Sequence, residues 1–284
     1  WTESSAENKE RFLKERMLFD ITLFSDDSKI QRKPKGHLYL YPLIAIAAML
    51  AIVFVMDLPH MHKPKQQLSQ TIRIPAGQRA QMDLPDGSVV WLNSQTTLTY
   101  DEDFGKKDRK VTLDGEAYFE VAHNKEIPFY VQTENIKVQV TGTKFDVCSY
   151  KGSNSFIARL IEGSINLLTN SAKEEKTITS LTKGKYFSME NGKYRTGEMS
   201  SNNALAWMQG IYYFDDVPFK ELLDKIALYY NYKITVKNPK ILENYRCTGK
   251  FKDLDGIEHI LKVIQKDHPF KYDIDNEHNK ITIE

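Results

Sequence analysis

The chain has 284 residues, of which 41% are hydrophobic, and its formal net charge is +1. This length suffices for one large or two smaller domains, and the near-zero charge argues against a protein that binds nucleic acid directly. Two cysteines, Cys148 and Cys247, exclude a disulfide-dense scaffold and a four-cysteine zinc site. Because the chain starts at Trp1 rather than at a methionine, we expect it to be a fragment of a longer protein.

Residues 6–24, AENKERFLKERMLFDITLF, carry apolar side chains at a helical spacing. The acidic run Ser25–Ser28 marks the expected end of this helix. A single helix cannot bury such a stripe by itself, so either upstream helices or a partner protein would cover it, and the two possibilities are compatible. The apolar residues available to a partner are Phe12, Leu13, Met17, Phe19 and Ile21.

The segment from Leu38 to Met56, LYLYPLIAIAAMLAIVFVM, contains no charged residue. As a helix it would be about 28 Å long, close to the ~30 Å hydrocarbon core of a bilayer. A buried core helix would normally include polar residues, and a cleaved signal peptide would not follow so long a polar stretch. We therefore expect a single transmembrane helix over residues 38–56.

Basic residues crowd the N-terminal side of this segment, at Lys29, Arg32, Lys33 and Lys35, whereas Asp57 follows it directly. Positive residues favour the cytoplasmic side of a membrane. We therefore expect residues 1–36 to be a truncated cytoplasmic helical segment and the C-terminal part to be periplasmic, in a single-pass protein of the bacterial inner membrane. Residues 57–70 are polar and contain Pro64, which is typical of a linker; His60 and His62 within it lack a third metal ligand nearby.

Residues 71–200 are rich in Val, Ile, Thr, Tyr and Phe with partial alternation, which predicts an all-β antiparallel domain, a sandwich or a roll. Turn signals separate the expected strands at Asp86-Gly87, Asp114-Gly115, Glu162-Gly163 and Asn191-Gly192. The residue pattern changes over residues 204–284. They predict a small α+β domain of two similar strand–helix–strand halves, with helices from about Pro218 and over LDGIEHILKVIQKD.

Glu116 and Glu120 in LDGEAYFEV raise the question of a catalytic carboxylate pair. On a strand they share one face with Tyr118, whereas the alternate residues Ala117, Phe119 and Val121 point into the core. The two carboxylates would then lie roughly 13 Å apart, beyond the roughly 5–10 Å of glycosidase pairs. We therefore expect a half-exposed strand whose glutamates are hydrogen-bonded or charge-paired.

Few other residue motifs are typical of catalysis or of ligand binding. We therefore expect no cofactor, no metal site and no enzymatic activity in the ordinary sense. The bond Gly142-Thr143 is an exception, because a threonine hydroxyl can attack the preceding carbonyl if the backbone is strained. The alternative, a glycine at a bulge or close strand crossing, is favoured on physical grounds alone. Cys148 and Cys247 could pair in an oxidising compartment or remain small buried side chains.

Three stretches, in this order, resemble FecR-family anti-sigma factors: RIPAGQRAQMDLPDGSVVWLNSQTTLTYDEDF, RKVTLDGEAYFEVAHNKEIPFYV and VQVTGTKFDVCSY. WMQGIYYFDDVPFKELLDKIALYYNYKI with CTGKF resembles the domain that follows in Bacteroidetes members, which is similar to the short N-terminal domains of secretins and TonB-dependent transducers. WTESSAENKERFLKERMLFD resembles the end of the cytoplasmic sigma-binding segment of the family. Together these stretches cover nearly the whole chain.

The resemblance implies a relay. A SusC-like TonB-dependent outer-membrane transporter would present its signalling domain to the periplasmic part, and the cytoplasmic part would hold and release an extracytoplasmic-function (ECF) sigma factor. We expect the transporter to dock on the C-terminal domain, with Tyr212, Phe214, Tyr245 and Phe251 as candidates, because open sheet edges accept a partner strand. Some family members cut themselves at a Gly-Thr bond, which would make Gly142-Thr143 the site of self-cleavage.

Two other classes of function remain open from the sequence. A membrane-anchored periplasmic polysaccharide-binding protein would use Trp91 and the many tyrosines. An anchored hydrolase would use Glu116 or Glu120. Neither class explains a helical cytoplasmic segment.

Overall fold

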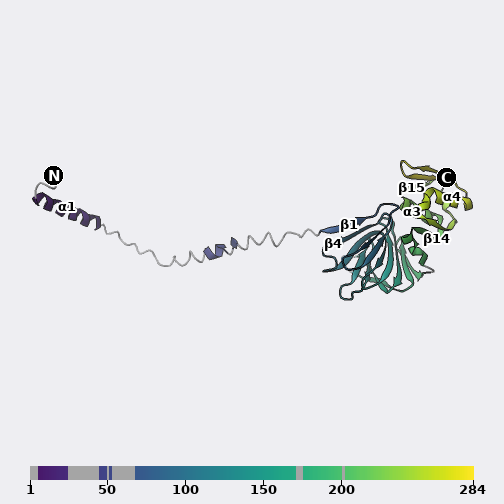
Figure 1. The fold of residues 1–284 in the computed structure, drawn as a ribbon, viewed down its shortest axis with the longest axis horizontal. Coiled ribbons are helices and arrows are strands. Elements are labelled where there is room, and N and C mark those ends of the chain that lie inside the picture. Colours follow the sequence, from purple (N-terminus) through teal and green to yellow (C-terminus); the bar gives the residue numbers. More distant parts are fainter. Residues whose placement is uncertain (1–5, 25–44, 50, 53–67, 171–174, 200–201) are drawn as a thin grey trace. The chain divides into compact units, whose positions relative to one another are not determined.

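A computed structural model of the chain describes residues 6–24, 45–49, 51–52, 68–170, 175–199 and 202–284 (Figure 1). The chain divides into two compact units, Trp1–Gln66 and Gln67–Glu284. In the first unit, helix α1 (Ala6–Phe24) confirms the predicted helix and its bounds.

The predicted membrane segment lies largely outside the described residues. Within it, residues 45–49 and 51–52 are helical, and Ile46, Met49 and Ile52 are exposed. Among the described residues, no helix is both long and apolar enough to cross a bilayer. His60 and His62 also lie outside the described part of the chain.

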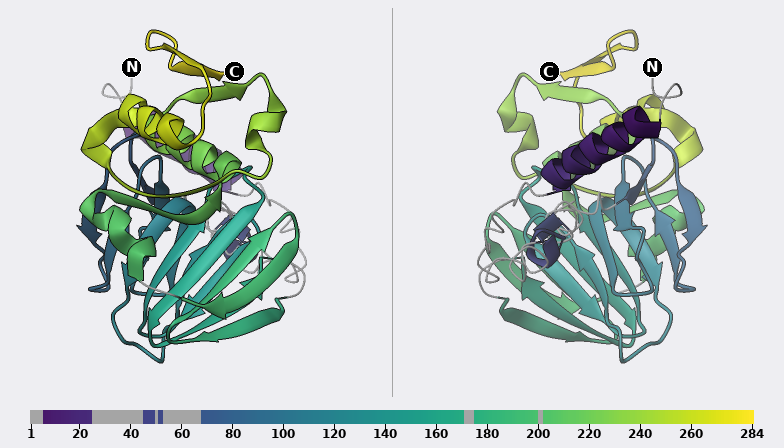
Figure 2. Two further views of the ribbon diagram at one scale, coloured as in Figure 1. Left: turned by 90° about the vertical axis from the view of Figure 1, so that its right-hand side faces the viewer. Right: turned by 90° about the vertical axis from the view of Figure 1, so that its left-hand side faces the viewer.

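The second unit begins with a curled 13-stranded sheet (Figure 2). Its hairpins at Asp86-Gly87 and Asn191-Gly192 lie at the predicted turns. The first strand begins two residues before the predicted domain start at Thr71. The strands are β1 (Ser69–Arg73), β2 (Ala80–Asp83), β3 (Val89–Leu92), β4 (Thr97–Asp101), β5 (Arg109–Glu120), β6 (Phe129–Gln132), β7 (Ile136–Val140), β8 (Lys144–Ser149), β9 (Ser155–Glu162), β10 (Ser164–Thr169), β11 (Thr177–Thr182), β12 (Lys185–Glu190) and β13 (Lys193–Glu198).

Strand β5 belongs to both halves of the sheet. Its first half pairs with β4 and β6, and its second half pairs with β3 and β8. The inner face encloses one apolar core, to which Ala117 and Phe119 contribute as predicted. The expectation of a purely antiparallel domain is wrong at one pair, because β5 and β6 run parallel. A parallel pair needs a crossover connection, and the second half of β5 together with residues 121–128 supplies it.

The change of partners in β5 occurs at Gly115. Asp114 still pairs with Thr97 of β4, whereas Gly115 pairs with Ser149 of β8. Gly115 has φ +133°, and a Cβ there would lie 2.4 Å from Oγ1 of Thr96. The prediction of a turn at Asp114-Gly115 is therefore wrong: the dipeptide lies inside a strand, and glycine is needed because the neighbouring chain passes too close for a side chain.

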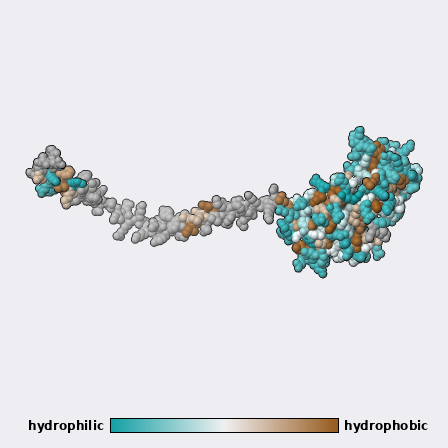
Figure 3. All heavy atoms as spheres, in the orientation of Figure 1, coloured by the Kyte–Doolittle hydropathy of each residue, from teal (hydrophilic) through white to brown (hydrophobic). Residues whose placement is uncertain are grey.

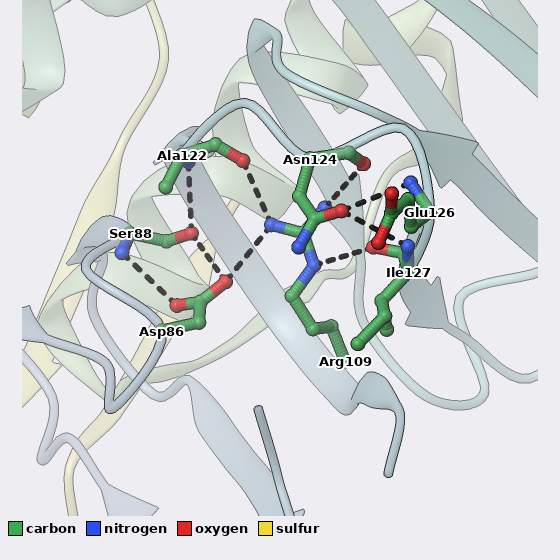
Figure 4. Close-up of polar contacts among 7 residues, drawn as sticks. All are labelled: Asp86, Ser88, Arg109, Ala122, Asn124, Glu126 and Ile127. Atoms are coloured by element: carbon green, nitrogen blue, oxygen red, sulfur yellow. Dashed lines mark hydrogen bonds and ion pairs between the residues drawn. The ribbon is translucent and has the colours of Figure 1, made fainter. Parts of the chain in front are cut away.

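A buried arginine holds the crossover in place (Figure 4). Arg109, at the start of β5, donates to the carbonyls of Ile127 (2.7 Å), Ala122 (2.7 Å) and Asn124 (3.1 Å). It also pairs with Asp86 at 3.2 Å, and both side chains are almost fully buried. Since Ala122 follows the end of β5 and Arg109 begins it, these bonds tie together the two ends of the bent strand.

The C-terminal residues form the predicted α+β domain, in which both predicted helices are confirmed. Their apolar stripes are buried, including Leu222 and Ile226 on one helix and Ile260 and Ile264 on the other. The two-stranded sheet β14–β16 and the three-stranded sheet β15-β18-β17 accompany them. The elements are η1 (Asn202–Gln209), β14 (Ile211–Pro218), α3 (Phe219–Tyr230), β15 (Lys233–Val236), η2 (Pro239–Leu242), β16 (Arg246–Lys252), η3 (Asp253–Asp255), α4 (Gly256–Asp267), β17 (Tyr272–Asp275) and β18 (Lys280–Ile283).

Replacing Gly115 by alanine is expected to lower the free energy of unfolding by about 3 kcal/mol or more, because both the positive φ and the contact with Thr96 oppose a Cβ. Urea unfolding monitored by circular dichroism measures this. Gly152→Ala is the matched control: its φ is also positive, but nothing lies within 4 Å of the added Cβ. The control is expected to cost only about 1 kcal/mol, and equal losses in the two variants would contradict a steric role for Thr96.

Replacing Arg109 by methionine is expected to cost about 3–5 kcal/mol, because Asp86 would keep a buried charge without its cation. The double variant Arg109→Met with Asp86→Asn removes both charges and should lose less than the single variant. The midpoints of urea unfolding compare the stability of the single and the double variant. The single variants Arg109→Met and Asp86→Asn give the two separate losses of stability. A double variant whose loss equals their sum would contradict the ion pair as the source of the loss.

Candidate functional site

The C-terminal domain packs against part of the outer face of the curled sheet, and the two share a second apolar core (Figure 2). Tyr118 of β5 is buried in this core with Trp207 of η1 and Phe214 of β14, and Trp91 of β3 packs against it. The rings of Trp91 and Tyr118 lie 5.4 Å apart. The sheet face that the sequence predicts to be half-exposed is therefore an interdomain surface.

Glu116 shows the effect of this interdomain burial most clearly. Its side chain is only 4% exposed, so the expectation of a half-exposed glutamate is wrong at this position, because alternation along a strand cannot reveal a second domain on the outer face. The expected pairing is confirmed. Asn93 donates to its carboxylate at 2.6 Å, and Arg159 lies 3.8 Å from it, whereas Glu120 pairs separately with Lys144 at 3.6 Å.

Arg159 is shared between two buried carboxylates. Its guanidinium lies 2.5 Å from Asp146 and reaches Glu116 as well. Burial raises the pKa of Asp146 well above its usual range; Arg159 lowers it in part, and the charge of Glu116 raises it further. One guanidinium cannot neutralise two carboxylates, so this cluster favours an added proton.

The indole of Trp207 lies against this cluster from the C-terminal domain. Its N–H is buried, as is Oδ1 of Asp146, and neither atom has a well-formed hydrogen bond within the described part of the chain. A buried polar atom without a good partner is costly. At this cluster, hydrogen bonds therefore do not fully offset the free-energy cost of burying polar groups between the two domains.

The loop between β3 and β4 contacts the carboxyl end of α3. Ser94 donates to the carbonyl of Tyr229 at 3.3 Å, and Gln95 donates to the carbonyl of Leu228. Nearby, Arg79 pairs with Asp253 of η3. Sequence reasoning missed these residues, and only the WLNSQT stretch within the family-like motif pointed to this loop.

The proposed docking residues Tyr212, Phe214, Tyr245 and Phe251 are all buried in the second core. They shape the C-terminal domain from inside and do not form its surface. On the same two-stranded sheet, Tyr213 points outward and is 39% exposed. Strand alternation explains this arrangement, because Tyr212 and Phe214 on either side of Tyr213 point to the buried face of β14.

The candidates on α1 are exposed where their side chains are described. Phe12, Leu13 and Met17 are 50%, 55% and 65% exposed, and Figure 3 shows apolar side chains on the surface of this helix. The side chains of Phe19 and Ile21 lie outside the described part. α1 therefore presents an apolar surface that the rest of its own helix cannot cover.

Gly142 and Thr143 lie directly before β8. A Cβ on Gly142 would meet His123, at 2.4 Å from Nδ1, which explains glycine as a site of close approach. Thr143 is buried, and its hydroxyl donates to the carbonyl of Ser164 at 3.0 Å. Self-cleavage of this bond stays a prediction. Cys148 and Cys247 are both free thiols and do not form the disulfide considered from the sequence.

Comparison with known proteins gives two family matches. The model described as FecR protein matches residues 70–166, and the model described as FecR, C-terminal, matches residues 211–283; together they span more than half of the chain. These matches confirm the resemblance found in the sequence. No curated protein matches the chain.

Solved structures share the fold of the second unit. A crystal structure at 2.50 Å resolution of a "putative anti-sigma factor" from Parabacteroides distasonis is 25% identical, with a TM-score of 0.65 over 76% of this chain and 98% of that chain. A second one, at 1.65 Å resolution and with the same description and organism, is 24% identical, with the same TM-score and coverage. Both relatives are therefore covered almost in full.

The raised pKa of Asp146 predicts a pH dependence of stability. From about pH 4, where the unfolded chain loses this proton, towards neutral pH, the folded protein keeps it longer, so the free energy of unfolding should fall as the pH rises. Asp146→Asn should flatten this slope in urea unfolding between pH 5 and pH 8. Asp83→Asn, at an exposed carboxylate, is the control. An unchanged slope in Asp146→Asn would show that this carboxylate does not hold the proton.

Proposed function

Since the chain belongs to the FecR family, we propose that it is an anti-sigma factor that binds an ECF sigma factor through α1. The observation that carries this proposal is the combination of an exposed apolar helix in one compact unit with FecR architecture in the other. The relative from Parabacteroides distasonis, described in the same terms, supports it.

The binding surface on α1 is defined by Leu13 and Met17, which are one helical turn apart and more than half exposed. Apolar anchors in a groove of the partner are the usual way in which an amphipathic helix is recognised. A sigma factor that covers this surface would supply the burial that the helix lacks.

The membrane arrangement belongs to the same proposal. Residues 38–56 are apolar enough to span a bilayer once, and the basic residues before them favour a cytoplasmic N-terminus. The FecR unit would then lie in the periplasm of the bacterial inner membrane. This arrangement puts α1 on the side where sigma factors act.

The signal would come from a SusC-like TonB-dependent transporter of the outer membrane. Its signalling domain would dock on the C-terminal α+β domain, whose three-stranded sheet has β15 and β17 at its edges. Free edges can accept a strand from a partner, with backbone hydrogen bonds giving affinity. On the two-stranded sheet β14–β16, the outward-facing Tyr213 would add an aromatic contact, and the buried side chains of Phe214 and Phe251 would support it from the core.

Replacing Leu13 and Met17 together by glutamine is expected to weaken binding of the sigma factor at least about tenfold, because two apolar anchors are lost while helix propensity is kept. Pull-down of the full-length protein from its host, with quantification of the sigma factor and the transporter, measures this. The transporter should still co-purify, because the periplasmic domains are unchanged.

Glu15→Gln, an exposed position on the same helix, is the matched control and should leave sigma binding intact. Equal recovery of the sigma factor with the double variant would contradict α1 as the binding surface. Failure of the unmodified protein to retain any sigma factor would contradict the anti-sigma function itself.

A further inference from the structure

We infer that the C-terminal domain controls the pairing of β1 through a polar latch, and that this latch is the route by which a docked partner reaches the membrane segment. The interdomain latch consists of the Arg79–Asp253 ion pair and of the bonds from Ser94 and Gln95 to the end of α3. The inference deepens the proposed function, on which it rests, by assigning the regulation of the docking domain.

Strand β1 is a short edge strand of the sheet. It has five residues, four of them exposed, and within the described part of the chain it pairs with β4 alone. Its side-chain bonds are peripheral: Thr71 with Thr99 at 3.1 Å and Gln70 with Tyr100 at 2.8 Å. Short exposed edge strands have low opening free energies. β1 is also the first strand in the sequence after the predicted membrane segment.

The residues that follow β1 are held from two sides. Ile74 donates to Thr96 at 2.8 Å, and the N–H of Gly77 donates to the hydroxyl of Ser94 at 2.8 Å. That same hydroxyl donates to the carbonyl of Tyr229 on α3. A single serine therefore connects the segment after β1 with the helix of the other domain.

The carbonyls at the end of α3 depend on this contact. Asn231 ends the helix in the left-handed conformation, and its N–H binds the carbonyl of Ala227. The last carbonyls of a helix have no partner within the helix. Those of Leu228 and Tyr229 accept from Gln95 and Ser94, so the first domain supplies the cap of the second.

The Arg79–Asp253 pair supplies the charged part of the latch. The side chains are 23% and 17% exposed, so the pair is only partly screened by water. Nη1 of Arg79 is buried without a hydrogen-bond partner among the described residues, whereas the guanidinium interacts with Asp253 of η3 and with the side chain of Tyr212 on β14. Because Arg79 lies directly before β2, at the end of the segment that connects β1 with β2, movement of η3 would act on β2 and, through that segment, on β1.

The consequence follows from linkage. If docking of the two domains favours paired β1, then a partner that binds the undocked C-terminal domain more tightly must also favour released β1, by at most the free energy that couples docking to the pairing of β1. The partner needs no contact with β1. The relevant partner chemistry is a strand that engages a sheet edge of the C-terminal domain, as in the proposed function.

Amide hydrogen exchange on the full chain in detergent micelles tests the latch without a sigma factor or a transporter, so its outcome is independent of the proposed function. Asp253→Asn and Arg79→Gln should each speed exchange of residues Ser69–Arg73 by about three- to tenfold, since one charge-assisted bond is lost. Exchange in β7, which lies inside the sheet, should stay unchanged and shows that the domain remains folded. Lys262→Gln, which removes the exposed Glu258–Lys262 pair on α4, is the matched control and should have no effect.

The double variant Arg79→Gln with Asp253→Asn should exchange in β1 no faster than the faster single variant, because the two residues act as one pair. Unchanged exchange in β1 in both single variants would overturn the latch. Additive acceleration in the double variant would overturn the ion pair as its charged part.

Discussion

The FecR unit depends on how β5 bends. A flat strand could pair with two neighbours over its whole length, but β5 has to pair with β4 and β6 first and with β3 and β8 afterwards. Only a residue without a side chain can turn this corner against Thr96, and Gly115 supplies it. The bend brings the ends of the strand together, where Arg109 ties them through the crossover that makes β6 parallel. The apolar core forms inside this bend.

The same bend determines what lies outside it. Directly after Gly115, the outward positions of β5 are Glu116 and Tyr118, and the C-terminal domain covers both. A sheet face that carries carboxylates and an arginine is a poor surface to bury, because the desolvation of charges opposes docking. Aromatic burial by Tyr118, Trp207 and Phe214 offsets this cost. The free energy of the contact between the domains is therefore a balance of opposing contributions.

Sequence patterns predicted what local periodicity determines. The bounds of α1, the hairpin at Asn191-Gly192 and the buried stripes of α3 and α4 follow from spacing and turn chemistry. Asp114-Gly115 was misleading because an Asp-Gly pair looks the same at a turn and at a bend inside a strand. The burial of Glu116 and the latch around Arg79 arise between segments far apart in sequence, and Asp253 comes 174 positions after Arg79. Alternation and propensity carry no information about such contacts.

Arg79 and Asp253 are far apart in the sequence but in direct contact in the folded protein. The segment that connects β1 with β2 carries Arg79, so the C-terminal domain contacts the chain close to the first strand of the sheet. A partner can shift the state of β1 only by the difference between its affinities for the docked and undocked domain. Since the buried charges of Glu116, Asp146 and Arg159 already disfavour docking, that difference can be small and still change the population. The buried cluster beneath Trp207 and the polar latch therefore act in opposite directions on the contact between the two domains.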